Sequence, residues 1–332
     1  MENLNFGPYA KVVCHSSYTG ADILDELITL EVQFWRFILA EINTHRVLSR
    51  NYQSSRAVPI PKLIDQVRNN PAMPIHWGKN QAGMVANEQM EDYADFGKGE
   101  YQWSGAAVHA AERAETLYKQ GYHKQIVNRL LEPFMWTRGV ITATRAGWNS
   151  VFALRCHPDA QPEFQALAYK IKEAIDNSKP QMLKPGGWHL PYVESFWGKP
   201  RNGWSDRQYF PIFSEKKGEN ITRTWEKEYE LKDAIKISTS CCAQVSYRQL
   251  DDSLEKALKI YEMLNLPEGG KFKESPAHMS PCENQACVLG DKDKGFFGEG
   301  GFGLNGNFGT LGQVKWGQYR KILEKGLEVD FI

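Results

Sequence analysis

The sequence has no excess of charge of either sign. Forty Lys and Arg residues balance forty Asp and Glu residues in a chain of 332 residues, and the pI is about 7.1. Proteins that bind nucleic acid through their overall charge are basic, so we expect no nucleic-acid partner. A local cluster of arginines would therefore bind a small anionic ligand rather than a polyanion.

Two further features are missing. The first residues, MENLNFGPYAKVVCHSS, lack the charged and apolar regions of a signal peptide. The apolar runs are also too short to span a membrane. The sequence predicts a soluble, cytoplasmic protein without membrane contact, from a host cell or from something that replicates in one.

The cysteines form no CxxC pair, so neither a disulfide framework nor a zinc site is indicated, and we predict no metal. They are Cys14, Cys156, Cys241, Cys242, Cys282 and Cys287. Cys156 precedes His157, which is one way to build a thiol nucleophile, but neighbours on one helix point in different directions. Reduced and mostly buried thiols are the favoured interpretation.

The sequence before the arginine cluster predicts a strand and then a helix. Residues 27–34 alternate between apolar and polar side chains, which is typical of a half-buried strand. Apolar residues between 34 and 45 then recur at helical spacing, so His45 ends a buried stripe. A serine-rich loop follows Ser49, and Pro59 and Pro61 stop any helix there.

Other segments predict a mixture of helices and strands, which indicates an α+β or α/β protein. Helices are expected at 105–119, 123–133, 148–155, 159–178 and 251–264, and a strand at 138–146. Residues 233–248 read as a strand or a strand-to-helix entry, and 180–230 as an irregular insertion. The helix at 251–264 has an Asp cap and shows Leu254, Leu258 and Tyr261 on one face.

A glycine-rich tract covers residues 295–312. Gly298, Gly300 and Gly303 match GxGxxG, but no strand leads into the match and no clear helix leaves it. A flexible or interface loop is favoured over a dinucleotide site.

The segment INTHRVLSRNYQSSR gathers groups that bind anions. Arginine offers paired donors to phosphate or carboxylate, and serine hydroxyls add further donors. Ser54, Ser55 and Arg56 would hold one phosphate, with Arg46 directed to the same region. Each of these residues alone fits a solvated loop or an ion pair; together they favour a ligand.

Two more arginines strengthen this interpretation. Arg129 and Arg155 lie on apolar helical segments, where an unpaired arginine is costly. Each is expected to have a carboxylate or a bound anion as partner.

THRVLSRNYQSSR resembles the signature of the flavin-dependent thymidylate synthases, RHR-x2-S-x-N-E-x-S-x-R. Six positions are kept at the family spacing, namely His45, Arg46, Ser49, Asn51, Ser54 and Arg56. HKQIVNRLLEP is similar to the family's short helix whose arginine reaches the nucleotide, here Arg129. WNSVFALRCHPDAQPEF resembles the helix that ends in L-R followed by A-Q-x-E, here Arg155 and residues 160–163.

The family's remaining landmarks lie near the other end of the chain. Members begin with A-R-V-S-Y, a helix and H-x-S-P-F-E-H, whereas here AQVSYR (243–248), a helix and HMSPCENQA (278–286) come last. The resemblance therefore implies a single, circularly permuted domain of 1–332, with core segments 10–60, 100–178 and 232–290. The insertion 180–230 and the glycine-rich segment 291–315 fall outside it.

The resemblance implies a mixed sheet flanked by helices and a homotetramer with active sites at its interfaces. It also implies FAD as cofactor, with NADPH as reductant, methylenetetrahydrofolate as carbon donor, dUMP as substrate and dTMP as product. Arg155 and Arg46 would be catalytic, with Arg155 facing the uracil ring. Flavin contacts would come from His45, Arg46, Asn51, Asn149, Ser246, His278, Ser280 and Glu283. Substrate contacts would come from Glu41, Ser54, Ser55, Arg56, Arg129 and Arg155.

The chain departs from the family inside the same pocket. Thr44 replaces the first arginine of RHR, Tyr52 the glutamate after the asparagine, and Glu41 a glutamine. Asp159 stands where the family has a histidine, and Asn284 replaces the second histidine of H-x-S-P-F-E-H. Glu41 could accept a hydrogen bond from an amino group, which would suit a cytosine nucleotide.

Two alternatives to the thymidylate synthase hypothesis stay open. One is a flavin-dependent hydroxymethylase on the same scaffold, acting on dUMP or dCMP, in which water traps the methylene group; Thr44 and Tyr52 motivate it. The other is a nucleotide- or flavin-binding protein without catalysis. Separately, residues 74–84 and 188–193 contain tryptophans that would either stack on folate or nicotinamide rings or anchor loops.

Overall fold

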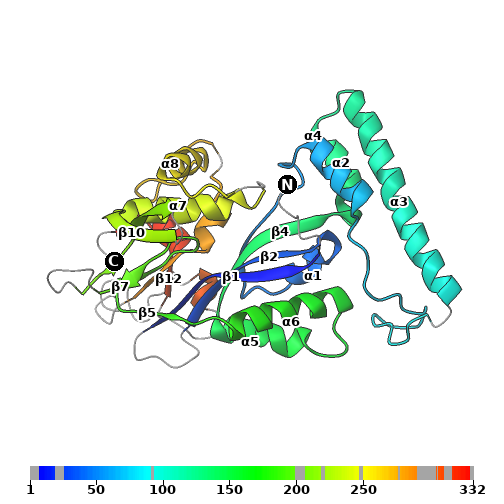
Figure 1. Ribbon diagram of the computed structural model, residues 1–332, viewed down its shortest axis with the longest axis horizontal. Helices are drawn as coiled ribbons and strands as arrows, with labels where there is room; N and C mark the ends of the chain where they lie inside the picture. Colours follow the sequence, from blue (N-terminus) through cyan, green and yellow to red (C-terminus); the bar gives the residue numbers. More distant parts are fainter. Residues whose placement is uncertain are drawn as a thin grey trace.

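The computed structural model describes residues 7–18, 26–90, 93–198, 206–217, 221–246, 250–275, 277–289, 304, 306–309 and 316–329. These residues form the α+β architecture that the sequence predicts, with helices on both faces of a mixed sheet (Figure 1). The glycines of the GxGxxG match and residues 247–248 lie outside the described residues.

The central sheet has five strands in the order β3-β4-β2-β1-β5. The strands are β1 (Tyr9–Tyr18), β2 (Glu26–Trp35), β3 (Ser49–Tyr52), β4 (Trp136–Thr144) and β5 (Gln181–Leu183). Neighbours pair antiparallel except β1 and β5, which are parallel. The sheet is therefore mixed, as predicted, although β1 and β5 were not expected from the sequence and β3 replaces part of the predicted loop.

Strand β2 is covered on both faces, so its prediction as half-buried is wrong. Its polar residues Thr29 and Gln33 are as buried as its apolar ones. They are tolerated because each has a partner: Thr29 contacts Thr142, and Gln33 donates to the carbonyl of Gly7. The alternation of apolar and polar residues thus predicted the strand correctly, but it did not predict that a second layer covers the polar face.

Helices α5 (Arg145–Arg155) and α6 (Pro162–Asp176) cover one face of the sheet, as predicted from their periodicity (Figure 1). Their apolar residues pack with β2 and β4 in the main core, which includes Phe34, Trp148 and Phe164. Each helix starts at a capped position, with Thr144 accepting from the amide of Gly147 and Gln161 from that of Phe164.

The segment before the motif is shorter as a helix than predicted. Strand β2 runs to Trp35, a 3₁₀ turn η2 (Arg36–Ile38) follows, and α1 covers only Leu39–Asn43. His45 is buried, as the stripe predicts. The prolines after the motif begin a helix instead of only stopping one, because α2 (Ile60–Asn69) has proline in its first turn, where no amide donor is needed.

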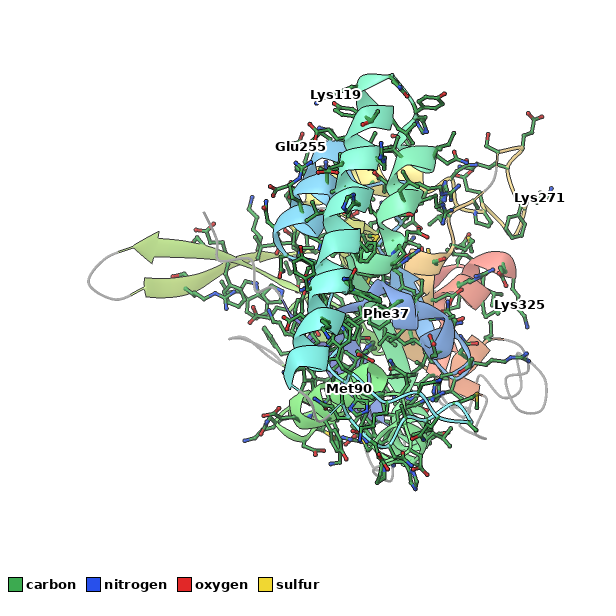
Figure 2. All side chains as sticks on the ribbon, turned by 90° about the vertical axis from the view of Figure 1, so that its right-hand side faces the viewer. Phe37, Met90, Lys119, Glu255, Lys271 and Lys325 are labelled. Carbon is green, nitrogen blue, oxygen red and sulfur yellow. The ribbon has the colours of Figure 1, made fainter. Side chains whose placement is uncertain are left out.

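A second helical layer stands beside the sheet. It consists of α2, the long α3 (Tyr93–Lys119), α4 (Lys124–Val127) and the 3₁₀ helix η3 (Asn128–Phe134), which contains Pro133. These elements share a separate apolar cluster, and Figure 2 shows α3 running along the outside of the molecule. Among the described residues, no helix is long and apolar enough to cross a membrane.

The insertion at 180–230 is more regular than predicted. It holds β5, β6 (Trp188–His189), β7 (Phe196–Trp197), β8 (Gln208–Tyr209) and the hairpin β9 (Pro211–Lys217)–β10 (Ile221–Glu228). The hairpin projects from the body in Figure 2. Strand β6 is buried and pairs with β11 (Ala286–Val288), which in turn pairs with β12 (Trp316–Gln318).

The C-terminal part packs against the other face of the sheet. Its elements are α7 (Leu231–Ala243), η4 (Gln244–Ser246), α8 (Leu254–Met263), η5 (Ser280–Glu283), η6 (Gly306–Gly309) and α10 (Tyr319–Glu324). The strand reading of 233–248 is wrong, because α7 is a helix whose β-branched residues are buried on several sides. Helix α8 forms as predicted, but its cap is Ser253, and Leu258 is exposed while Ala257 and Ile260 are buried.

Candidate functional site

The serine-rich loop closes on a single carboxylate. Ser55, which is buried, donates from Oγ to Oε1 of Glu132 at 2.6 Å. Arg129 reaches the same oxygen at 3.0 Å and Arg36 at 3.5 Å. Glu132 therefore holds together the loop, the 3₁₀ helix η3 and the turn after β2.

Asn128 fixes the backbone of the serine-rich loop. Its Nδ2 donates to the carbonyls of Ser55 at 2.6 Å and of Val58 at 3.0 Å. Ser54 Oγ accepts from the amide of Arg56 at 3.3 Å, and the Arg56 side chain is exposed. The loop is thus fixed against η3, with the Ser55 hydroxyl bound to Glu132 and the Arg56 side chain exposed.

His45 and Arg155 form a pair that contains no carboxylate. Arg155 Nε donates to His45 Nε2 at 2.8 Å, and its guanidinium lies 4.7 Å from the ring centroid of Phe164. Since arginine only donates, the proton of the neutral imidazole must lie on Nδ1. Burial, and then the charges of Arg155 and Arg50, lower the pKa of His45 to about 4.

Arg50 fixes the turn that carries this histidine. Its guanidinium donates to the carbonyls of Leu48 at 2.8 Å, of His45 at 3.2 Å and of Asn43 at 3.4 Å. Arg46 is exposed beside it. The motif therefore uses one arginine to build its own turn and leaves another facing solvent.

Three of the departures from the family pattern, Glu41, Thr44 and Tyr52, lie in the segments around this turn. The Oε2 atom of Glu41 is buried and has no hydrogen-bond partner among the described residues, and Thr44 Oγ1 donates to the Glu41 carbonyl at 2.6 Å. The Tyr52 ring packs on Gly139, where an added Cβ would meet it at 2.3 Å. The Tyr52 hydroxyl is likewise buried without a partner in the described part of the chain.

The C-terminal segments reach the same edge of the sheet. Asn51 Nδ2 donates to the carbonyl of Cys242 at 2.9 Å. Gln318 Nε2 donates to Ser49 Oγ at 2.8 Å and to the carbonyl of Glu283 at 3.1 Å. The structure therefore brings η5 and the end of α7 to β3, although more than 190 residues separate Asn51 from Cys242.

The predicted flavin residues on η5 and just before it differ in exposure. His278 and Ser280 are exposed. Glu283 is partly buried and forms an ion pair with Arg320. The side chain of Ser246 lies outside the described residues.

Asn284, where the family has a histidine, ends a buried hydrogen-bond chain. Its Oδ1 accepts from Thr142 Oγ1 at 3.0 Å, and Thr142 contacts Thr29 at 2.7 Å. Thr29 contacts His189 Nε2 at 2.7 Å, and His189 Nδ1 contacts Ser16 Oγ at 2.9 Å. Burial lowers the pKa of His189 to about 3, so its imidazole is neutral.

Asn149, another predicted flavin residue, makes no hydrogen bond to the motif within the described residues. It lines a different cavity, of about 320 Å³, together with His15, Glu26 and Arg145. Asp159, which stands where the family has a histidine, is exposed, and its backbone amide donates to His157 Nδ1 at 3.2 Å.

The tryptophans of residues 74–84 and 188–193 both pack against other parts of the chain. Trp77 packs edge-on against Trp103 of α3, with ring centroids 6.5 Å apart. Trp188 is 2% exposed. The cysteines carry no disulfide, and burial raises the pKa of Cys156, which argues against an activated thiol there.

Sequence reasoning missed Glu132, Asn128 and Gln318. Glu132 had a usable signal, because it lies three residues after Arg129 on a helical segment. Gln318 had none, since it is far from the motif in sequence. Within the described residues, no group of three or more His, Cys, Asp or Glu side chains is placed to hold a metal ion.

Comparison with known proteins supports the resemblance. Residues 26–181 match the model of the family described as thymidylate synthase complementing protein, Thy1, which confirms the resemblance over that range. The match includes the motif, Arg129 and Arg155, and supports a nucleotide-modifying enzyme. The segments at 243–248 and 278–286 lie outside it, so the circular permutation stays a prediction. No curated protein matches the sequence.

Among solved structures, the chain is similar to a UMP/dUMP methylase PolB from Streptomyces cacaoi. In the crystal structure with 5-Br dUMP, the identity is 18%, the TM-score 0.39, and the alignment covers 47% of this chain and 69% of the other. In that with 5-Br UMP, the identity is 14%, the TM-score 0.42, and the coverage 51% and 88%.

Proposed function

We propose, on the basis of the Thy1 match, that this chain is a flavin-dependent thymidylate synthase that converts dUMP to dTMP. Methylenetetrahydrofolate would supply the carbon, NADPH the reducing equivalents and FAD the redox cofactor. The observation that carries the proposal is the His45–Arg155 pair, because it sets an uncompensated cation inside the segment that matches the family.

The residues present fit an anionic cofactor and an anionic substrate. Arg46, Arg56 and the exposed part of Arg129 supply charged donors, and the buried Oε2 of Glu41 is an acceptor without a partner in the described structure. In the proposal, Ser54, Ser55, Arg56 and Arg129 hold the nucleotide phosphate. His45, Arg46, Asn51, His278, Ser280 and Glu283 contact the flavin, which supplies hydride chemistry when bound.

Arg155 would act on the pyrimidine. A guanidinium directed at a ring carbonyl stabilises negative charge that develops there. His45 accepts the Nε hydrogen and stays neutral above a pH of about 4. The pair would therefore hold the arginine fork in place without cancelling its charge, which a carboxylate partner would do.

The substrate phosphate would compete with the Glu132 carboxylate for the same hydrogen-bond donors. Ser55 and Arg129 both donate to Glu132 Oε1. Binding of the phosphate would therefore require these donors to rotate toward it, or to donate to the phosphate and to Glu132 at the same time. Arg36, also within 3.5 Å of that oxygen, would keep Glu132 partnered during the exchange.

Assembly into a homotetramer is part of the same proposal. Sites completed at subunit interfaces would explain why His278, Ser280 and Arg46 face solvent in a single chain. Size-exclusion chromatography with light scattering, with and without FAD, measures the oligomeric state directly.

A second product remains a candidate because of Tyr52 and Thr44. Tyr52 puts a buried phenol, packed on Gly139, where the family has a carboxylate. In a hydroxymethylase, water would add to the methylene group before the group is reduced. The two products differ by one oxygen atom.

The test is incubation of the pure protein with FAD, NADPH, methylenetetrahydrofolate and dUMP, followed by mass spectrometry of the nucleotide. A gain of CH2 supports thymidylate synthesis, and a gain of CH2O supports hydroxymethylation. Unchanged dUMP and unchanged dCMP, in protein shown to bind flavin, would overturn both catalytic proposals and leave a binding protein.

A further inference from the structure

A cavity of about 390 Å³ lies in the insertion that follows the family match. Its lining residues fall between Pro185 and Leu231, and none of them belongs to the motif. The volume is in the range of small-molecule sites. It exceeds the volumes of two other cavities among the described residues, which measure about 320 and 90 Å³.

Aromatic side chains form the walls of this cavity. They are Trp188, Trp197, Phe210 and Tyr229. Trp188 and Phe210 are 2% and 4% exposed, whereas Trp197 and Tyr229 are partly exposed. The accessible faces are therefore those of Trp197 and Tyr229, and flat apolar faces favour a planar ring that stacks.

The walls are held in place by polar contacts. Trp197 Nε1 donates to Asp206 Oδ1 at 2.6 Å. The amide side chain of Gln208 contacts the backbone of Trp188 twice, at 2.6 Å and 2.8 Å. Gly187 lets Trp197 approach, because an added Cβ there would lie 2.8 Å from the indole. The cavity is therefore preformed and does not need a ligand to assemble it.

The rim of the cavity is rich in hydrogen-bond acceptors. Asp206, Glu228 and Glu230 line it, against the lining cation Arg207 and the adjacent Lys184, which pairs with Asp206. Arg207 pairs with Glu228 at 2.5 Å and stacks on Tyr209 at 4.0 Å. Because carboxylates outnumber cations, the lining disfavours an anion and favours a ligand edge that donates hydrogen bonds.

The carboxylates retain capacity to accept. A carboxylate has about four acceptor positions. The contacts at Asp206 from Trp197 and from Lys184, each at 2.6 Å, both reach Oδ1. The contact of Glu228 with Arg207 reaches Oε1.

We propose that this cavity binds a planar fused-ring heterocycle with adjacent N–H donors, the 2-amino-4-oxopyrimidine edge that guanine and pterins share. Trp197 and Tyr229, the partly exposed aromatic residues, stack on the ring faces, and the rim carboxylates accept from the ring N–H and the amino group. Adenine lacks this pair of donors beside a carbonyl, so the site discriminates against it. The proposal rests on the cavity and not on the flavin chemistry.

The experiment is isothermal titration of the full-length protein, without flavin, using guanosine, pterin and adenosine as neutral probes. We expect guanosine, pterin or both to bind with a Kd of about 100 µM or tighter, and adenosine at least about tenfold more weakly. Binding of pterin alone identifies a pterin ligand, and binding of guanosine identifies a guanine ligand.

Variants locate the binding. Asp206→Asn with Glu228→Gln removes the acceptor charges and should weaken binding about tenfold or more, while flavin loading and dUMP turnover stay unchanged. Glu194→Gln, an exposed residue of the same insertion paired with Arg223, is the matched control. Circular dichroism checks folding, and Glu228→Gln alone serves if the double variant does not fold.

Three results would overturn the proposal. They are absence of binding of both guanosine and pterin, equal affinity for adenosine, and unchanged affinity in a folded Asp206→Asn, Glu228→Gln variant. None of them bears on turnover of dUMP, so failure here is distinct from failure of the proposed function.

Discussion

Arg129 and Arg155 both come from apolar helical segments, yet their surroundings differ. Arg129 is more than half exposed and pairs with Glu132, which also binds Ser55 and Arg36. Arg155 is partly buried and donates to a neutral histidine above an aromatic ring. The first arginine has its charge balanced by a carboxylate, whereas the partner of the second is a neutral imidazole.

The largest expected effect comes from removing that second charge. Arg155→Ala should lower kcat for dUMP modification by about 100-fold or more, because it removes a charge that the transition state needs. Steady-state kinetics with a product assay measures this. Arg68→Ala, which breaks an exposed ion pair with Glu115, should leave kcat unchanged. Equal losses in both variants would contradict the distinction.

A pH titration of stability tests the neutral partner. The pKa of His45 falls from 6.5 to about 4 on folding, so the unfolded state binds more protons between these values. The free energy of unfolding should therefore decrease as the pH is lowered from 6.5 to 4, by up to about 1.4 kcal/mol per pH unit. Urea denaturation at each pH measures it.

The control for this titration is His45→Gln, which keeps an acceptor but does not titrate. Its stability should depend less on pH in the same window. His189, whose pKa also falls, contributes equally to both proteins and cancels in the difference. Identical slopes would show that His45 is not the neutral partner of Arg155.

Glu132→Gln tests the balanced arginine. With the carboxylate gone, Arg129 and Ser55 should become available to phosphate, and dUMP should bind about three- to tenfold more tightly. Titration calorimetry with dUMP and with inorganic phosphate measures this, with Glu112→Gln on α3 as control. Weaker binding would mean that Glu132 organises the site and does not compete with the ligand.

A comparison of stabilities separates the two serines. Ser55→Ala removes a buried hydrogen bond to a carboxylate and should cost about 1.5–3 kcal/mol of stability. Ser54→Ala, in the more open part of the loop, should cost about 0.5 kcal/mol or less. Thermal melting of the two variants gives the order, and the reverse order would place the structural role on Ser54.

The sequence was informative where local pattern and tertiary structure agree. The periodicities of α5 and α6 and the apolar run of β4 predicted those elements closely. Helix α7 was misread because Ile and Thr in KISTS favour strands, and burial on several sides overrides that preference.

The site shows the same limit. The motif singled out His45 and Ser55, and two other segments singled out Arg129 and Arg155, because each of these patterns belongs to a single stretch of sequence. The contact of Gln318 with Ser49, and that of Asn51 with Cys242, join segments far apart in the chain. Such contacts depend on how the C-terminal part folds back on β3, and no local pattern encodes that.

The buried chain from Ser16 to Asn284 has only one allowed arrangement of hydrogens. The amide oxygen of Asn284 can only accept, so Thr142 must donate to it, Thr29 to Thr142, His189 Nε2 to Thr29, and Ser16 to His189 Nδ1. A histidine at 284 could present either a donor or an acceptor and so permit the reverse order. With asparagine at 284, all hydrogen bonds of this network point in one direction. The network therefore joins the β6 segment and η5 to the sheet. It cannot relay a proton between them.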